Sequence, residues 1–198
     1  MRKQLVSFLF LLSIVAVSAR AQDVALKTNL LYDATSTMNI GAEIGLSRKL
    51  TLDISGNLNP WVFNKNTNSK IQHILIQPEI RYWLCERFNG HFFGAHAHWG
   101  NYNAGAIDLP FGLTENTLAK YRYRGNLYGF GVGYGYQWVF RSRWAVEAEL
   151  GVGYTYFKYD RYECRSCGKF TGNNKSNYLG PTKLAVSLIY IIESLVSH

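Results

Sequence analysis

The amino-acid sequence predicts an all-β fold, an eight-stranded antiparallel up-and-down transmembrane β-barrel. Three observations predict it. Eight separate segments alternate apolar with polar residues, which is the pattern of a strand with one apolar face. Short connections between these segments alternate with long ones. The first residues have the features of a secretory signal peptide, so the chain is expected to leave the cytoplasm.

Residues 1–21 are interpreted as that signal peptide. Two basic residues lie near its start, an apolar stretch covers 5–17, and Ala19-Arg20-Ala21 gives the small-x-small pattern that precedes cleavage. A retained membrane anchor is the alternative. The apolar stretch is shorter than the roughly 20 residues that a spanning helix needs, so cleavage is favoured. Residues 22–198 are then expected to form one domain, the barrel.

The charge of the chain argues against a nucleic-acid partner. There are 21 Lys and Arg against 13 Asp and Glu, and three of the basic residues lie in the leader. The mature chain therefore has a net charge of only about +5, spread along its length. An exported protein also rarely meets nucleic acid.

The predicted strands and connections follow the order expected of an outer-membrane barrel, with short turns in the periplasm and long loops outside. The strands are expected at 24–33, 38–46, 50–59, 71–84, 91–100, 124–140, 144–158 and 178–192. The short turns are expected at 47–49, 85–90 and 141–143, and the long loops at 59–70, 101–123 and 159–177.

Aromatic residues gather at strand ends, as they do in the girdles of membrane barrels. Around two of the short turns these residues are Trp138, Phe140, Trp144, Tyr82, Trp83 and Phe88. The alternative is a soluble secreted β-sandwich or lipocalin-like barrel, in which the polar face would meet water and carry many Lys and Glu. Here one face of nearly every strand is uncharged, and Gly and ionisable residues lie opposite, which favours lipid. Closure would satisfy every strand's hydrogen bonds there.

The charged residues of the strands share the face that points inward in a barrel. On the sixth strand that face holds Gly129, Gly131, Gly133 and Gly135, which leave space for long side chains of the two neighbouring strands. We predict a polar network across this glycine floor, with the structural role of filling an interior that is only just wide enough for side chains. Its members are Glu43, Asp53, Glu79, Arg81, His96, His98, Glu147, Glu149 and Lys183, and Lys27 and His73 share their inward parity.

The sequence predicts no catalytic residue, no metal ligand and no cofactor. The alternative makes His96 or His98 the base of a barrel enzyme that modifies lipid A. Such chemistry needs a nucleophile or carboxylate beside the histidine, and the spacing places no inward Ser or Asp there. A metal site formed by His73, His96 and His98 is disfavoured, because only His96 and His98 are close to each other in the sequence.

Two cysteines form a C-x-x-C pattern, Cys164 and Cys167, in the last predicted loop. Zinc needs about four ligands, and redox chemistry needs a helix N-terminus that is not predicted here. A disulfide that pinches the loop is expected in an oxidising compartment. Cys85 is expected to be an unpaired, buried thiol. The external loops are moderately basic. A basic rim can meet lipid phosphates, but it is more often a solvated edge, which is the interpretation favoured here because Asp160 and Glu163 dilute the charge.

Four segments resemble an uncharacterised family of small outer-membrane proteins, a domain of unknown function common in anaerobic Gram-negative bacteria. They are KTNLLYDATSTMNIGAEIGL (27–46), RYWLCERFNGHFFGAHAHWGNYN (81–103), CRSCG (164–168) and NYLGPTKLAVSLIYII (177–192). The resemblance covers essentially the whole mature chain. It implies an OmpA/OmpX-like barrel, sometimes encoded near surface fimbriae, and no established activity. The last predicted strand departs from better-known barrels because it does not finish on a terminal aromatic residue.

The expected function is therefore that of a non-enzymatic barrel in the outer membrane of a Gram-negative bacterium. It would support the envelope or present its long external loops for surface interaction. The expected partners are outer-membrane lipid, lipopolysaccharide and a surface or fimbrial protein. The sequence does not determine the oligomeric state.

Overall fold

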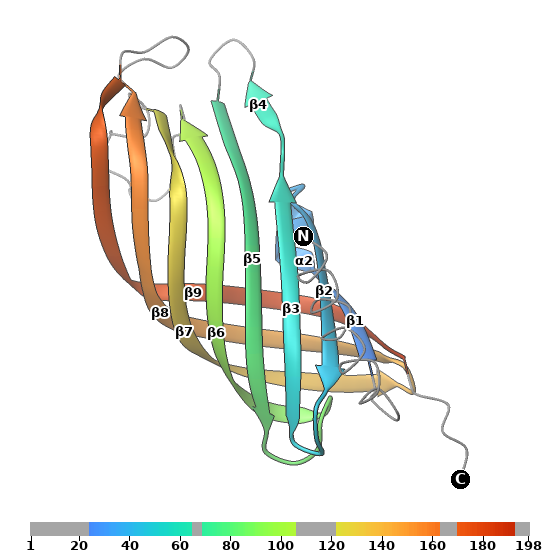
Figure 1. The fold of residues 1–198 in the computed structure, drawn as a ribbon. Helices are drawn as coiled ribbons and strands as arrows, with labels where there is room; N and C mark the ends of the chain where they lie inside the picture. Colours follow the sequence, from blue (N-terminus) through green and yellow to red (C-terminus); the bar gives the residue numbers. More distant parts are fainter. Residues whose placement is uncertain (1–23, 65–68, 106–121, 163–169, 193–198) are drawn as a thin grey trace, which may run out of the picture.

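The computed structural model describes residues 24–64, 69–105, 122–162 and 170–192 (Figure 1). None of its helices in these ranges is long and apolar enough to cross a membrane. The elements are β1 (Val24–Asn29), α2 (Leu30–Ala34), β2 (Met38–Gly45), β3 (Leu50–Asn59), β4 (Val62–Asn64), β5 (Ser69–Trp83), β6 (Gly90–Gly105), β7 (Arg122–Arg141), β8 (Trp144–Tyr162) and β9 (Phe170–Ile192).

Eight of the described strands form one ring-like antiparallel sheet in up-and-down order. Neighbours in the chain pair with each other, β1 pairs with β9, and β3 pairs with β5. The short strand β4 only extends β5 at one end. The sequence-based prediction of an all-β fold with eight antiparallel up-and-down strands is therefore confirmed. We call the space enclosed by these strands the ring interior.

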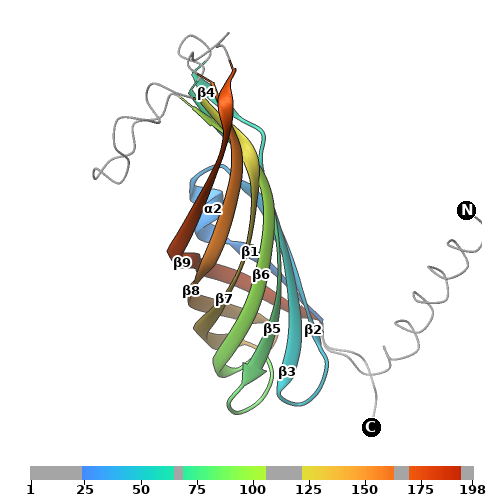
Figure 2. The ribbon, with the colours of Figure 1, turned by 60° about the vertical axis from the view of Figure 1, so that its left-hand side comes forward.

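The first predicted strand, 24–33, is wrong in its second half. The strand ends at Asn29, whose side-chain Oδ1 accepts a hydrogen bond from the Leu31 backbone N–H at 3.1 Å and so caps helix α2. The sequence LLYDA that follows does not alternate apolar with polar residues. Figure 2 shows α2 at mid-height within the sheet.

The last predicted loop, 159–177, is also largely wrong, because β8 continues to Tyr162 and β9 already starts at Phe170. The ladder continues through register pairs such as Tyr159 with Asn174. Apolar alternation stops before this point, so the sequence pattern ends while the backbone pairing does not. Figure 2 shows β8 and β9 continuing well beyond α2. We call this extension of five strands the wall; it comprises 69–75, 100–105, 122–127, 157–162 and 170–176.

The faces of the ring are inverted relative to a water-soluble protein. Outward residues are apolar and exposed, and Phe130 and Val132 are 65% and 62% exposed. Inward residues are mostly polar and buried, among them Glu43, Glu79 and Glu147. The buried hydrophobic cluster in the described residues is small and consists of Ala25, Phe88, Ala145, Ile189 and Ile191.

Two aromatic residues assigned to a girdle from the sequence lie inside the ring instead. Trp83 and Phe88 are 0% and 5% exposed, and the Trp83 ring packs 4.8 Å from that of Phe92. Trp83 Nε1 also donates to Thr51 Oγ1 at 2.9 Å. Tyr82, which directly precedes Trp83 on β5, faces outward and is exposed. Successive side chains of a strand point to opposite faces, so Tyr82 and Trp83 lie on different sides of β5 although they are adjacent in the sequence.

Candidate functional site

The ring interior holds eight buried ionisable side chains that contact one another, which we call the interior cluster. They come from six different strands, and each side chain is at most 8% exposed. The members are Lys27 on β1, Glu43 on β2, Asp53 on β3, Glu79 and Arg81 on β5, Glu147 and Glu149 on β8, and Lys183 on β9.

Arg81 lies at the centre of the interior cluster. Its guanidinium donates to both carboxylate oxygens of Glu147, at 2.8 and 3.1 Å, in a bidentate pair. It also donates to Glu43 Oε2 at 2.9 Å and to Glu149 Oε2 at 2.7 Å. Phe92 lies against the guanidinium carbon, 4.4 Å from ring centroid to Cζ. One cation therefore links three carboxylates from β2 and β8.

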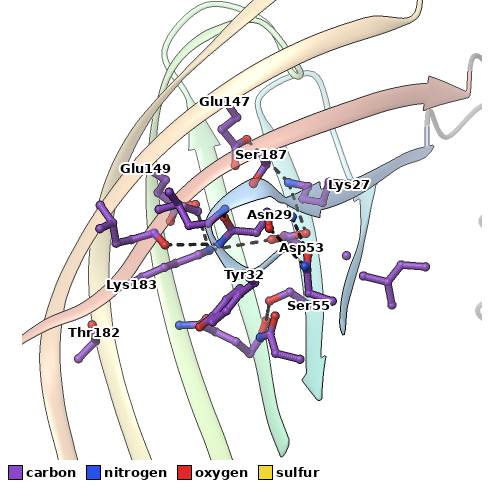
Figure 3. Close-up of a pocket in the computed structure, with 18 of the residues that line it drawn as sticks. Lys27, Asn29, Tyr32, Asp53, Ser55, Glu147, Glu149, Thr182, Lys183 and Ser187 are labelled. Carbon is purple, nitrogen blue, oxygen red and sulfur yellow. Dashed lines mark hydrogen bonds and ion pairs between the residues drawn. The ribbon is translucent and has the colours of Figure 1, made fainter. Parts of the chain in front are cut away.

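The two lysines complete the pairing from different sides, as Figure 3 shows. Lys27 Nζ lies 2.5 Å from Glu43 Oε2 and 3.4 Å from Asp53 Oδ1. Lys183 Nζ contacts Glu79 and lies 3.0 Å from Glu149 Oε2. Every carboxylate of the interior cluster thus has at least one cation within ion-pair distance, which offsets the cost of removing the ions from water.

The interior cluster contains five carboxylates and three cations, so its formal net charge is −2. A cavity of 380 Å³ lies beside it and is lined by Lys27, Asp53, Glu149, Lys183 and, from α2, Tyr32. Burial raises the pKa of Tyr32, and Lys183 acts in the opposite direction. A cavity of this size beside charged side chains has room for water, which would hydrate the excess negative charge.

Glycines make room for the long inward side chains. A Cβ on Gly131 would lie 2.7 Å from His96 Nε2, and one on Gly133 would lie 3.0 Å from Glu149 Oε1. The same relation occurs elsewhere in the ring, where a Cβ on Gly41 would lie 2.6 Å from Lys27 Cγ. The structure therefore places the glycines of β7 under His96 and Glu149, side chains from both neighbouring strands.

The two histidines lie inside the ring but outside the ion-paired network predicted for them. His96 Nε2 lies 2.9 Å from Thr182 Oγ1, and His98 Nε2 lies 2.9 Å from Thr155 Oγ1. Thr155 could have been found from its inward parity on β8. Thr182 could not, because a bulge in β9 shifts the register between Gly151 and Val152.

The geometry around these histidines does not form a catalytic relay. The Nδ1 atoms of His96 and His98 are buried without a hydrogen-bond partner, so no carboxylate orients either ring toward its threonine. Within the described ranges no group of three His, Cys, Asp or Glu residues is arranged to hold a metal ion.

Of the three cysteines, the structure describes Cys85. Cys85 is a free thiol and is exposed, so its expected burial is wrong. It lies in the turn between β5 and β6, where the chain has left the ring interior. Cys164 and Cys167 lie outside the described residues.

Replacement of Arg81 tests whether the interior cluster is desolvated. We expect Arg81→Met to lower the free energy of unfolding by about 3–5 kcal/mol, because it removes the cation that bonds three buried carboxylates and leaves only the two lysines against five carboxylates. The measurement is a urea titration followed by Trp fluorescence. Arg48→Met, which removes an exposed charge at the turn after β2, is the control and should change stability by less than about 0.5 kcal/mol. Equal stability of the two variants would show that the ions of the interior cluster are not desolvated.

Comparison with known proteins identifies the family. No curated protein and no solved structure shows significant similarity to the chain. The model of one family, described as "Protein of unknown function (DUF3575)", matches residues 6–192 and so spans all eight strands of the ring. The expected resemblance to a domain of unknown function is thereby confirmed, and the chain belongs to the DUF3575 family.

Proposed function

We propose that the ring is a transmembrane β-barrel in the outer membrane of a Gram-negative bacterium. In this proposal it is a non-enzymatic anchor that presents the wall, and the connections that follow it, for interaction at the cell surface. The interacting molecule would be a surface or fimbrial protein. The observation that supports this proposal most directly is the continuous apolar outer face around a buried, charged interior.

The height of the apolar outer face fits a membrane. On β8 its outward positions run from Trp144 to Tyr156 without a charged residue. These twelve steps cover about 40 Å along the strand at about 3.3 Å each. With a strand tilt near 45°, this length corresponds to a band about 28 Å high, close to the roughly 25 Å typical of outer-membrane barrels. We call this outer surface the apolar band.

Both ends of the apolar band carry aromatic residues. At the turn end, Trp144 packs against its register partner Tyr190, with ring centroids 5.1 Å apart. At the wall end, Trp99, Tyr128 and Tyr156 are neighbours across three strands. Such rows match the interfacial girdles of membrane barrels. Beyond them the outer face becomes polar, with amides such as Asn101 and Asn126 hydrogen-bonded at 2.9 Å.

The filled interior argues for an anchor and against a pore. The interior cluster crosses the ring, since Arg81 on β5 bonds to Glu43 on β2 and to Glu147 on β8. Trp83 and Phe92 fill the interior next to it, toward the turn end. An eight-stranded barrel filled in this way leaves no channel along its axis. Recognition is then left to the parts that rise beyond the apolar band.

An arginine in the apolar band tests membrane insertion. We expect Val132→Arg to lower the free energy of unfolding in lipid vesicles by about 2–4 kcal/mol, because the charge enters hydrocarbon. Ser142→Arg in the turn between β7 and β8 is the control and should be neutral. In a water-soluble protein a 62%-exposed Val132 would tolerate arginine with a change below about 0.5 kcal/mol. That result, or recovery of the chain outside the outer-membrane fraction, would contradict the proposal.

Cysteine labelling tests which end of the ring faces outside. In a Cys164→Ser, Cys167→Ser background, native Cys85 reports on the turn end, and an added Asn173→Cys reports on the wall. We expect a membrane-impermeant maleimide to label Asn173→Cys on intact cells, and Cys85 only after permeabilisation. Both sites are exposed, so burial does not account for a difference. Labelling of Cys85 on intact cells would reverse the orientation.

A lipid A-modifying enzyme is the second candidate, and the contact of His98 Nε2 with the Thr155 hydroxyl favours it. We expect lipid A mass spectra to be the same in a deletion strain, in the complemented strain and in a His98→Ala strain. The physical reason is that no third group orients the histidine. A mass change that needs the wild-type chain and disappears in His98→Ala would establish the enzyme instead.

A further inference from the structure

Basic side chains gather on the outer face of the wall on one side of the ring. Lys158 on β8 and Lys175 on β9 are register partners, and both are exposed. Arg124 on β7 is also exposed and lies two residues beyond Asn126, the partner of Lys158. We call Arg124, Lys158 and Lys175 the basic patch. At the same level, the outer faces of β5 and β6 carry the amides Gln72, Asn101 and Asn103.

The basic patch lacks a matching counter-charge within the described residues. Like charges directly opposite each other on one face of a sheet are destabilising, and the Lys158–Lys175 pair is of this kind. In the described part of the chain, neither ammonium has a hydrogen-bond or ion-pair partner. Among the described residues the carboxylate on this face is that of Asp160, the register partner of Arg124. Three cations against one anion leave a local charge of +2, which an external anion can balance.

The position of the basic patch indicates which anion this is. Lys158 lies two residues beyond Tyr156, or about 7 Å along the strand, where the apolar band ends. Tyr156 belongs to the aromatic row that the proposed function places at the membrane interface. A side chain one row above that level lies among lipid headgroups, and the phosphates of anionic lipids attract Lys and Arg there. Phosphate also accepts charge-assisted hydrogen bonds from both residue types.

We propose that the basic patch binds the phosphate groups of a phosphorylated glycolipid of the outer leaflet. Lys158 and Lys175 hold one phosphate between β8 and β9, and Arg124 extends the site along β7. Asn126 Oδ1 accepts a hydrogen bond from Asn101, which leaves the Asn126 amide N–H groups as further donors beside Lys158. The inference rests on the proposed function, because the lipid's acyl chains would lie against the apolar band.

The test compares bisphosphorylated lipid A with the same lipid after removal of both phosphates. Binding to the full-length chain, purified in dodecyl maltoside micelles, is measured by native mass spectrometry. We expect the wild-type chain to prefer the phosphorylated lipid by about tenfold. The double variant Lys158→Gln, Lys175→Gln should lose most of this preference. Asp160→Asn should strengthen it, because the variant removes a repulsive carboxylate from the same face.

The matched control removes two exposed charges at the opposite end of the ring, in Arg48→Gln, Arg141→Gln. It has the same net charge as the double lysine variant and should keep the preference for phosphate. Equal binding of the two lipids by the wild-type chain, or equal losses in both double variants, would overturn the inference alone. Heating before electrophoresis and membrane fractionation check the barrel separately. A chain that fails those checks would overturn the proposed function and the inference together.

Discussion

The ion pairs around Arg81 constrain the rest of the structure. A guanidinium and several carboxylates inside a protein are stable only if each ion has partners, because desolvation of an isolated ion costs many kcal/mol. Here the partners come from strands as distant in sequence as β2 and β8. They can meet only when the sheet curves until its first and last strands pair. Ring closure and charge pairing therefore depend on each other, and neither the single hairpins nor an open sheet would satisfy these ions.

The same pairs select the register of the strands. Buried ion pairs are weak evidence for net stability, but they distinguish strongly between arrangements. A slip of one residue would move the inward side chains of a strand to the outside. Glu43 and Asp53, which are register partners, would then lie among leucine and isoleucine. Glycines support the correct register, since Gly94 is the partner of Arg81 and Gly151 is the partner of Lys183. Each leaves space that a larger side chain would fill.

Three levels along the ring have different chemistry and, in our proposal, different tasks. The turn end is closed by buried apolar and aromatic side chains such as Trp83 and Ile189. The middle holds the interior cluster inside and the apolar band outside. The wall has amides and cations outside and aromatic pairs on its other face, including Tyr102 with Phe157 at 5.9 Å. The wall presents exposed cations and amides beyond the apolar band, so we assign both surface contacts and lipid phosphates to it.

The sequence by itself determined the number of strands, their up-and-down order and which residues share a face. Period-two alternation is a local property, and it placed Glu43, Arg81 and Glu147 on one side without knowledge of the fold. Contacts across the ring depend on register and curvature, so only the tertiary structure could join Arg81 to its carboxylates and assign His96 to Thr182 at a bulge. The tertiary structure also decided where the strands end. Helix α2 replaces the second half of the first predicted strand, because the Asn29 side chain caps this helix. The wall continues where apolar alternation stops, because backbone pairing between neighbouring strands does not require an apolar face.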